Sequence, residues 1–270
     1  GQWFLNHNAM AGVELAMWDL QGTVLDRPVY DLLGGKVRDE IECYVTTYAE
    51  VMDHFADEGF FGVKLPVHHS PSDGRAGIDA IKEMVRDARA AFGDDTEVML
   101  ECYMAWDKEY TVRVAERRKA YEIKWIEDPL PPGHSTAQYR DIRQAIKPIQ
   151  LAIGNLEWGH EAFHDLIEND AGDVIQPDIS WAGGLLEARR IAAMAKPNGL
   201  PVVPHYTTPY TCHFIVSCTE SPYGEYMGGY HTGVEANNPV LEGEPLPEDG
   251  VIELDGDPGF GVELDRDAIV

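Results

Sequence analysis

Chemically capable side chains stand at the ends of several short apolar runs in this chain. Glu101 ends EVMLE, Glu127 ends IKWIE, Asp178 ends DVIQPD and His205 ends PVVPH. Two carboxylates held close together disfavour joint ionisation unless a cation lies between them. A histidine beside an aspartate makes a base suited to neutral pH. These residue types therefore predict an acid–base enzyme that uses a metal ion.

Glu101 and Glu127 are the first candidates for ligands of a divalent metal. A hard ion such as Mg²⁺ binds carboxylate oxygens and keeps several of its waters. Asn155 ends the next apolar run, QLAIGN, and its amide oxygen is an acceptable third ligand, with Glu157 as the second choice. Two other interpretations stay open for the glutamates: solvated carboxylates near helix ends, or the acid and nucleophile of a glycosidase.

The remaining polar residues in or after apolar runs admit both structural and chemical interpretations. His205 is either a structural histidine or a general base whose tautomer is fixed by Asp178. Lys64, in FFGVKLP, could donate to an anionic oxygen or extend its aliphatic stem along apolar surface. Glu225, in YGE, could donate or accept a hydrogen bond on the opposite wall of the same site.

Segments with helical periodicity separate these runs. The clearest one has an apolar face at three- and four-residue spacing, made by Ile78, Ile81, Val85, Ala88 and Phe92. Other helices are predicted at 8–21, 110–121, after a cap at Ser135, and at 159–168, 184–195 and 208–218. Strands are predicted at 41–48, 60–66, 97–101, 123–127, 149–154, 173–177, 200–204 and 223–227.

Eight strands in strict alternation with helices predict a closed, parallel α/β barrel rather than a sandwich. The carboxyl ends of the strands converge on one mouth of such a barrel, so residues far apart in sequence are expected to meet there. Beyond residue 230 the composition changes to segments rich in Gly, Pro, Asp and Glu. We expect this tail to pack as an irregular extension without a helix.

Composition limits the functional classes. The chain has 270 residues, 44% of them hydrophobic, and a formal net charge of -26 from 47 acidic and 21 basic residues. Such a surface repels nucleic acid and anionic membranes, so neither is an expected partner. The acidic excess is spread along the chain, which favours adaptation to high salt, as in a halophilic protein, over ordinary solubility through net charge.

Cysteine use and hydropathy predict a soluble, cytoplasmic protein. Cys43, Cys102, Cys212 and Cys218 form no CxxC pair and are expected to be buried free thiols in a reducing compartment. No apolar run reaches the about 20 residues that span a bilayer, and no signal peptide is visible. The first residue is Gly rather than Met, which fits a processed or trimmed start.

Longer motifs extend over nearly the whole chain: VELAMWDLQGTVLDRPVYDLLGGKVRD, GVKLPVHHSPSDG, KWIEDPLPP, VIQPDISWAGGL, VVPHYTTPY and PGFGVELDRD. Together they resemble the mandelate racemase subgroup of the enolase superfamily, and within it acid-sugar dehydratases of the L-rhamnonate dehydratase type. The resemblance implies a (β/α)7β TIM-like barrel, with most of the N-terminal α+β capping domain absent from this chain. It implies a linker helix and connection at 1–40, the catalytic barrel at 41–229, and an extension returning to the cap at 230–270.

The resemblance also implies a metal site. It makes Glu101 and Glu127 the first two ligands of Mg²⁺. Asn155 stands where the family usually has a third carboxylate, which lowers the negative charge of the site by one. Glu157 could approach from the same side, so the third ligand stays open between these two residues.

The same resemblance implies roles for five further residues. His205 and Asp178 match a His–Asp dyad that removes the proton next to a carboxylate. Glu225 matches an acidic group that engages the substrate carboxylate or neighbouring hydrogen bonds. His68 and Trp181 are expected to contact the sugar-acid substrate.

Lys64-Leu65-Pro66 departs from the racemases of this subgroup, which carry Lys-x-Lys at the end of the second strand. Proline has no proton to exchange, so one of two opposed bases is missing and Lys64 is left to stabilise negative charge. The resemblance therefore implies Mg²⁺-dependent dehydration of a sugar acid to a 2-keto-3-deoxy acid, by a hydro-lyase that assembles as a homo-oligomer. An epimerase or cycloisomerase, or a non-catalytic barrel that binds acid sugars, are the alternatives.

Overall fold

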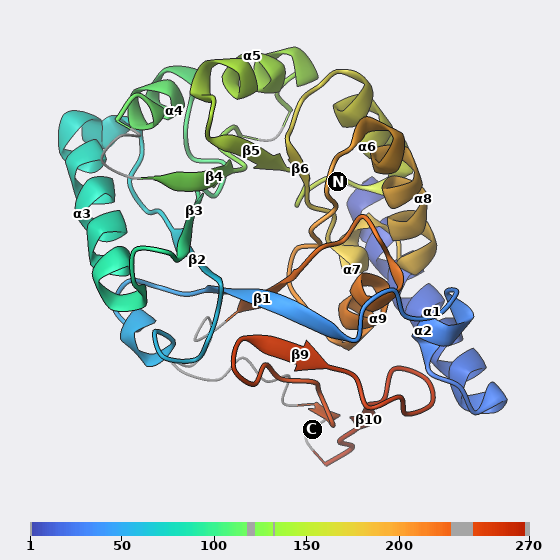
Figure 1. The fold of residues 1–270 in the computed structure, drawn as a ribbon. Helices are drawn as coiled ribbons and strands as arrows, with labels where there is room; N and C mark the ends of the chain where they lie inside the picture. The colour runs from blue at the N-terminus through green and yellow to red at the C-terminus, as the bar shows by residue number, and fades with distance from the viewer. Residues whose placement is uncertain (1, 118–121, 132, 228–239, 268–270) are drawn as a thin grey trace.

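A curled parallel sheet surrounded by helices forms the body of the protein (Figure 1). This computed structural model describes residues 2–117, 122–131, 133–227 and 240–267. Its sheet runs in the order β6-β5-β4-β3-β2-β1-β7. The strands are β1 (Glu40–Thr46), β2 (Gly62–Pro66), β3 (Glu97–Glu101), β4 (Ile123–Glu127), β5 (Gln150–Ile153), β6 (Val174–Ile175) and β7 (Gly224–Met227). The α/β barrel fold is thus confirmed.

The expected seventh strand at 200–204 was wrong in extent. This segment is joined to β6 by a single parallel bridge between Val202 and Ile175, and the backbone N–H of Val203 donates to the carbonyl of Ile175 at 2.8 Å. Pro201 and Pro204 flank the pairing residues, and proline has no backbone N–H to donate to a ladder. On the other side of the segment, the backbone N–H of Val202 donates to the carbonyl of Glu220, at 2.9 Å, which links this segment to the turn before β7.

The helices lie outside the sheet, and most of them overlap helices predicted from the sequence (Figure 1). They are α1 (Gln2–Leu25), α2 (Val29–Leu32), α3 (Gly74–Phe92), α4 (Lys108–Ala115), α5 (Thr136–Ile146), α6 (Gly159–Glu168), α7 (Ile179–Ala182), α8 (Leu185–Ala195) and α9 (Pro209–Ser217). Ser135 caps α5, as predicted, through a capping box with Gln138. The short helices α2 and α7 were not predicted. Helix α4 ends at Ala115, and the last four residues of the helix predicted at 110–121 lie outside the described residues.

Two apolar layers hold the barrel together. The strands bury Leu65, Leu100 and Ile126 against the surrounding helices. Tyr44, Met99, Trp125, Ala152, Val174 and Val203 form a separate cluster inside the barrel. Side chains alternate across a strand, so Glu101 and Glu127 share the inward face with Met99 and Trp125, two residues nearer the carboxyl end. An apolar plug therefore underlies a charged layer at the mouth.

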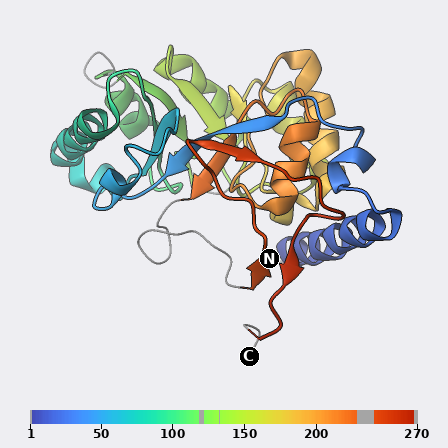
Figure 2. The ribbon, with the colours of Figure 1, turned by 60° about the horizontal axis from the view of Figure 1, so that its bottom comes forward.

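The C-terminal segment returns to the barrel and to α1 (Figure 2). Its strand β9 (Val251–Glu253) pairs antiparallel with the start of β1, while β8 (Leu241–Glu242) pairs with β10 (Glu263–Leu264). The backbone N–H of Phe260 donates to Asp19 of α1 at 2.9 Å. Residues 240–267 contain no helix, as predicted, but the pairing of β9 was missed.

Several expectations drawn from composition can be compared with the structure. All four cysteines are buried and free, as predicted. Within the described residues, no helix combines the length and apolarity needed to cross a bilayer. The proposed domain boundary at 229/230 lies outside the described residues, and the boundary at 40/41, the oligomeric state and the salt adaptation stay predictions.

Candidate active site

Lys64 is the centre of a buried ion network in the barrel. Its side chain is 2% exposed, and its Nζ lies 2.6 Å from Glu127 Oε1 and 2.7 Å from Glu225 Oε1. Burial lowers the pKa of Lys64, but the two carboxylates outweigh burial and hold that pKa well above its usual value. The ammonium group is therefore a fixed positive charge inside the barrel, which excludes the surface-stem interpretation of Lys64.

Glu225 is the second residue of β7 rather than the end of a strand. Its Oε1 accepts a hydrogen bond from Thr46 Oγ1 at 2.5 Å, and its Oε2 accepts one from the backbone N–H of Tyr206 at 3.0 Å. Burial raises the pKa of Glu225, but Lys64 and His205 together lower it to about 2. Glu225 is thus a permanently ionised partner of Lys64.

Glu101 and Glu127 lie side by side as cross-strand partners of β3 and β4. Both are buried, with 5% and 0% exposure. Glu127 Oε2 accepts hydrogen bonds from Trp125 Nε1 and Gln176 Nε2, each at 3.0 Å. Burial and the adjacent Glu127 hold the pKa of Glu101 well above its usual value. A bound cation would relieve both effects, because it would stabilise two ionised carboxylates.

Asn155 follows β5, the strand next to β4. The residue is 8% exposed, and its Oδ1 is buried without a hydrogen-bond partner among the described residues. A buried oxygen of this kind is costly unless something binds it. Two clustered carboxylates and one buried amide oxygen form a hard donor set, so these residues fit an ion such as Mg²⁺.

Glu157 has a different environment. It lines a pocket of about 250 Å³ together with Asp128, Tyr139 and Trp158. Burial and the charge of Asp165 on α6 raise the pKa of Glu157. Asn155 is therefore the better supported candidate for a third ligand, and Glu157 remains the second.

His205 and Asp178 form a hydrogen-bonded pair. The atoms His205 Nδ1 and Asp178 Oδ2 are 2.9 Å apart, and Asp178 also accepts from the backbone N–H groups of Ser180 and Trp181 at the start of α7. An ionised carboxylate only accepts, so Nδ1 carries the proton and Nε2 keeps its lone pair. Burial lowers the pKa of His205, but Asp178 and the charge of Glu225 outweigh burial and raise it. The pair can therefore take up a proton at Nε2.

Aromatic rings lie around the predicted substrate residues. The ring of His68 stacks between Tyr48 and Tyr103, with centroid distances of 5.9 and 6.0 Å. The ring of Trp181 lies 5.7 Å from that of His205. His68 therefore belongs to the stack of Tyr48 and Tyr103, whereas Trp181 lies beside the His–Asp pair.

Some residues of this network were missed in the sequence. Thr46 donates a hydrogen bond to Glu225, and Gln176 donates one to Glu127. Both were missed because the prediction considered mainly ionisable residues at the ends of apolar runs. Asp128 is 4% exposed, and its pKa is raised to about 7 by burial and by the adjacent Glu127. The position of Asp128 directly after Glu127, at the end of β4, was the one feature of the sequence that could have placed it near the site.

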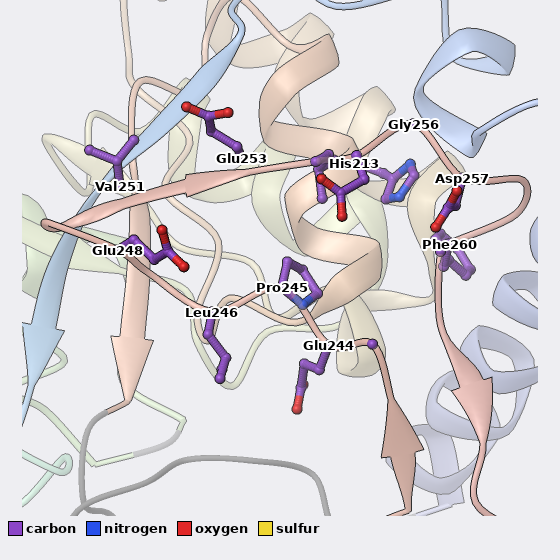
Figure 3. A pocket seen from close by; sticks show the side chains of 14 residues that line it. His213, Glu244, Pro245, Leu246, Glu248, Val251, Glu253, Gly256, Asp257 and Phe260 are labelled. Atoms are coloured by element: carbon purple, nitrogen blue, oxygen red, sulfur yellow. The ribbon is translucent and has the colours of Figure 1, made fainter.

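Another pocket, of about 550 Å³, lies under the C-terminal segment (Figure 3). It contains His213 and several carboxylates: Glu244, Glu248, Glu253, Asp255 and Asp257. His213 Nδ1 accepts the backbone N–H of Tyr30 at 3.0 Å. Burial lowers the pKa of His213 to about 4, so the ring is neutral. This histidine joins α2 to α9 and has no ionised carboxylate bound to its ring in the structure's described part.

The sequence was also compared with known families and proteins. The family described as "Enolase C-terminal domain-like" matches residues 47–268, and "Mandelate racemase / muconate lactonizing enzyme, N-terminal domain" matches residues 2–34. An L-rhamnonate dehydratase of Saccharopolyspora erythraea is 38% identical over 261 residues, which cover 95% of this chain and 66% of that protein. This chain thus spans 66% of the length of the curated relatives that it matches.

Solved structures of related enzymes were also compared with this chain. Rhamnonate dehydratase from Gibberella zeae, crystallised with Mg, superimposes with a TM-score of 0.90 at 32% identity, over 97% of this chain and 65% of that one. The 3,6-anhydro-D-galactonate cycloisomerase from Zobellia galactanivorans superimposes with a TM-score of 0.85 at 26% identity, over 97% of this chain and 74% of that one.

Proposed function

This chain belongs to the mandelate racemase and muconate lactonizing enzyme family of the enolase superfamily, and on that premise we propose that it dehydrates a sugar acid. The product is a 2-keto-3-deoxy acid. One observation supports the proposal above the others: a His–Asp pair and a cluster of buried carboxylates lie at the carboxyl ends of one curled parallel sheet. The relatives named L-rhamnonate dehydratase favour an aldonate of that kind as the substrate.

Glu101, Glu127 and Asn155 would hold Mg²⁺, with Glu157 as the second choice for the third ligand. Their support is the raised pKa of Glu101 beside Glu127 and the buried Oδ1 of Asn155. When bound, the ion supplies a Lewis acid that polarises the substrate carboxylate and stabilises negative charge developing on it. The hydrogen bonds from Trp125 and Gln176 to Glu127 would hold that ligand in place before the metal arrives.

His205 is the proposed base. Its Nε2 takes the proton from the carbon next to the substrate carboxylate, while Asp178 holds the ring in the required tautomer and stabilises the imidazolium that results. The 3-hydroxyl group then leaves as water and takes the proton from Nε2 of the same ring. The enol that remains loses the proton of its 2-hydroxyl group and gains one at C3 as it becomes the keto acid, so the net change is the loss of one water.

Lys64 and Glu225 have electrostatic roles in this proposal. Lys64 Nζ is already engaged by two carboxylates, so it compensates their charge instead of exchanging a proton. Pro66 stands two residues further along β2 and offers no proton, which leaves His205 as the base on one face of the substrate. Chemistry on one face favours elimination over racemisation. The stack of Tyr48, His68 and Tyr103 offers a wall for the hydroxylated chain.

The test is an assay of the full protein with Mg²⁺ and a panel of aldonic acids in D₂O. We expect a 2-keto-3-deoxy acid from at least one substrate, and we expect the His205→Asn variant to form none. Exchange of the proton at C2 without water loss would support an epimerase or cycloisomerase instead. Binding of an acid without exchange or product would support a non-catalytic barrel.

A further inference from the structure

The residue directly after the proposed base has an unusual backbone. Tyr206 has a φ of 57°, in the left-handed region that bulky residues rarely adopt. We propose that Tyr206 is a positioning residue, whose left-handed backbone ties the segment around His205 to Glu225 and so holds the His205 ring against Asp178. This inference rests on the proposed function, because it gives Tyr206 a task in placing the base.

The segment that carries His205 is not part of a regular strand. A single parallel bridge, between Val202 and Ile175, joins it to β6. Pro204, directly before His205, has no backbone N–H to donate. The position of His205 therefore depends on contacts made by this residue and by the residues that follow it.

Hydrogen bonds hold His205 from both sides. Its backbone N–H donates to the carbonyl of Pro177, just after β6, at 3.0 Å. On the other side, the N–H of Tyr206 donates to Glu225 Oε2 at 3.0 Å, and the N–H of Thr207 donates to the backbone carbonyl of Glu225 at 2.9 Å. Two successive N–H groups thus donate to one residue of β7, and the positive φ of Tyr206 is the turn of the backbone between them.

The residue types found at positive φ support a functional reason for this strain. Among the described residues other than glycine, positive φ occurs at four aspartates, one glutamate and three bulky residues: Tyr103, Met104 and Tyr206. Aspartate adopts the left-handed region more readily than most residues do. The three bulky residues all lie in the turns that directly follow Glu101 and His205. Strain of this kind persists where surrounding contacts enforce it, and it clusters at functional sites.

Glu225 connects this turn to the ion network of the barrel. Its carboxylate is buried, with Oε1 2.7 Å from Lys64 Nζ and Oε2 bound to the N–H of Tyr206. The base-bearing segment and the ion network thus share one carboxylate, which fixes the position of one relative to the other. Because a misplacement of about 1 Å can cost roughly 10²-fold in rate, loss of this link should lower kcat.

The experiment compares two substitutions of similar size. Tyr206→Asn and Tyr206→Val both remove the ring, but Asn tolerates the left-handed backbone and β-branched Val does not. With the best aldonate, we expect kcat of Tyr206→Val to lie roughly 10²-fold below that of Tyr206→Asn, with similar KM values.

Asp26→Val is the matched control for backbone strain alone. Asp26 is exposed, has a φ of 54° and directly follows α1. The Asp26→Val variant should lose stability but keep the kcat of the folded enzyme.

A second readout does not need turnover. The proton on His205 Nδ1, which Asp178 accepts, should give a low-field NMR signal in the metal-free protein, and its loss in His205→Asn assigns it. Tyr206→Asn should keep this signal and Tyr206→Val should lose it. The signal tests the position of His205 even if no aldonate is a substrate, so failure of the proposed function is distinguishable from failure of this inference.

Another pair of variants serves if Tyr206→Val does not fold. Tyr206→Gly and Tyr206→Ala make the same comparison, because Gly adopts positive φ without a steric penalty and Ala does not. Equal His205 signals in both members of a pair would overturn the proposal, and so would equal, measurable kcat values.

Discussion

The barrel mouth and the pocket under the C-terminal segment both bring carboxylates near a histidine, but they differ in how far the carboxylates are buried and paired. At the mouth the carboxylates of Glu127 and Glu225 are buried and share the ammonium group of Lys64. In the other pocket Glu248 and Glu253 are exposed to solvent. Water stabilises the charge of an exposed carboxylate, whereas a buried carboxylate needs a partner in the protein. The number of acidic groups is therefore a weaker sign of a functional site than their burial and pairing.

The two histidines show the same contrast. His205 binds the carboxylate of Asp178, and its pKa is raised. His213 accepts a backbone N–H from Tyr30, and burial lowers its pKa to about 4. A carboxylate partner stabilises the imidazolium ion, while a backbone donor stabilises the neutral ring. Only the first environment produces a base that gains a proton near neutral pH.

The largest expected effect is the difference in kcat between variants of His205 and His213. His205→Asn should lower kcat by roughly 10²–10⁴-fold, because a positioned general base contributes about that much. His213→Gln should lower stability but leave kcat of the folded enzyme unchanged. Steady-state kinetics with the best aldonate, corrected for the folded fraction, measures both. Equal losses of kcat in the two folded variants would contradict the comparison.

Lys64 offers the next test, through stability. Lys64→Met leaves two buried carboxylates without their shared cation and should destabilise the fold by about 3–5 kcal/mol. Lys124→Met is the matched control from strand β4 of the same sheet, because Lys124 pairs at 3.0 Å with Glu97, whose side chain is 44% exposed. The Lys124→Met change should lower the free energy of unfolding by less than about 1 kcal/mol. Urea unfolding measures both, and similar losses would show that burial does not distinguish the two pairs.

Local sequence patterns were enough to predict most of the barrel. Apolar runs located seven strands, and the spacing of Ile78, Ile81 and Val85 located α3, because both patterns arise within one element. The seventh predicted strand failed where Pro201 and Pro204 limit pairing. Strand β9 was missed because its three residues pair with β1, far away in the sequence, and carry little pattern of their own.

The candidate site was predictable where each strand brings its own polar residue to the mouth. Glu101, Glu127 and the pair of His205 with Asp178 were all expected there. The link between Lys64 and Glu225 was not, because it depends on β1 lying between β2 and β7 as the sheet curls. Contacts that arise from closure of a sheet have no local signal in the sequence.

Metal binding provides a smaller effect that separates the two pockets. Mg²⁺ at a hundred times its Kd should stabilise the protein by about 2.7 kcal/mol, because the ion binds only the folded state. Glu127→Gln should remove this effect, and Glu253→Gln, in the C-terminal pocket, should retain it. Thermal unfolding with and without Mg²⁺ measures the difference. A stabilisation that depends on Glu253 rather than Glu127 would place the ion in the wrong pocket for the proposed function.

The smallest expected change is a shift in one titration curve. In NMR spectra of the metal-free protein, the His205 imidazole should titrate above the ordinary pKa of about 6.5, and His213 should titrate far below it, near its pKa of about 4. Asp178 stabilises the protonated form of His205, so Asp178→Asn should lower the pKa of His205 and leave that of His213 unchanged. If His205 titrates no higher in the unchanged protein than in Asp178→Asn, the carboxylate does not tune the base. Asp178 would then only orient the ring, and the contrast between the two histidines would rest on the charge of Glu225 near His205.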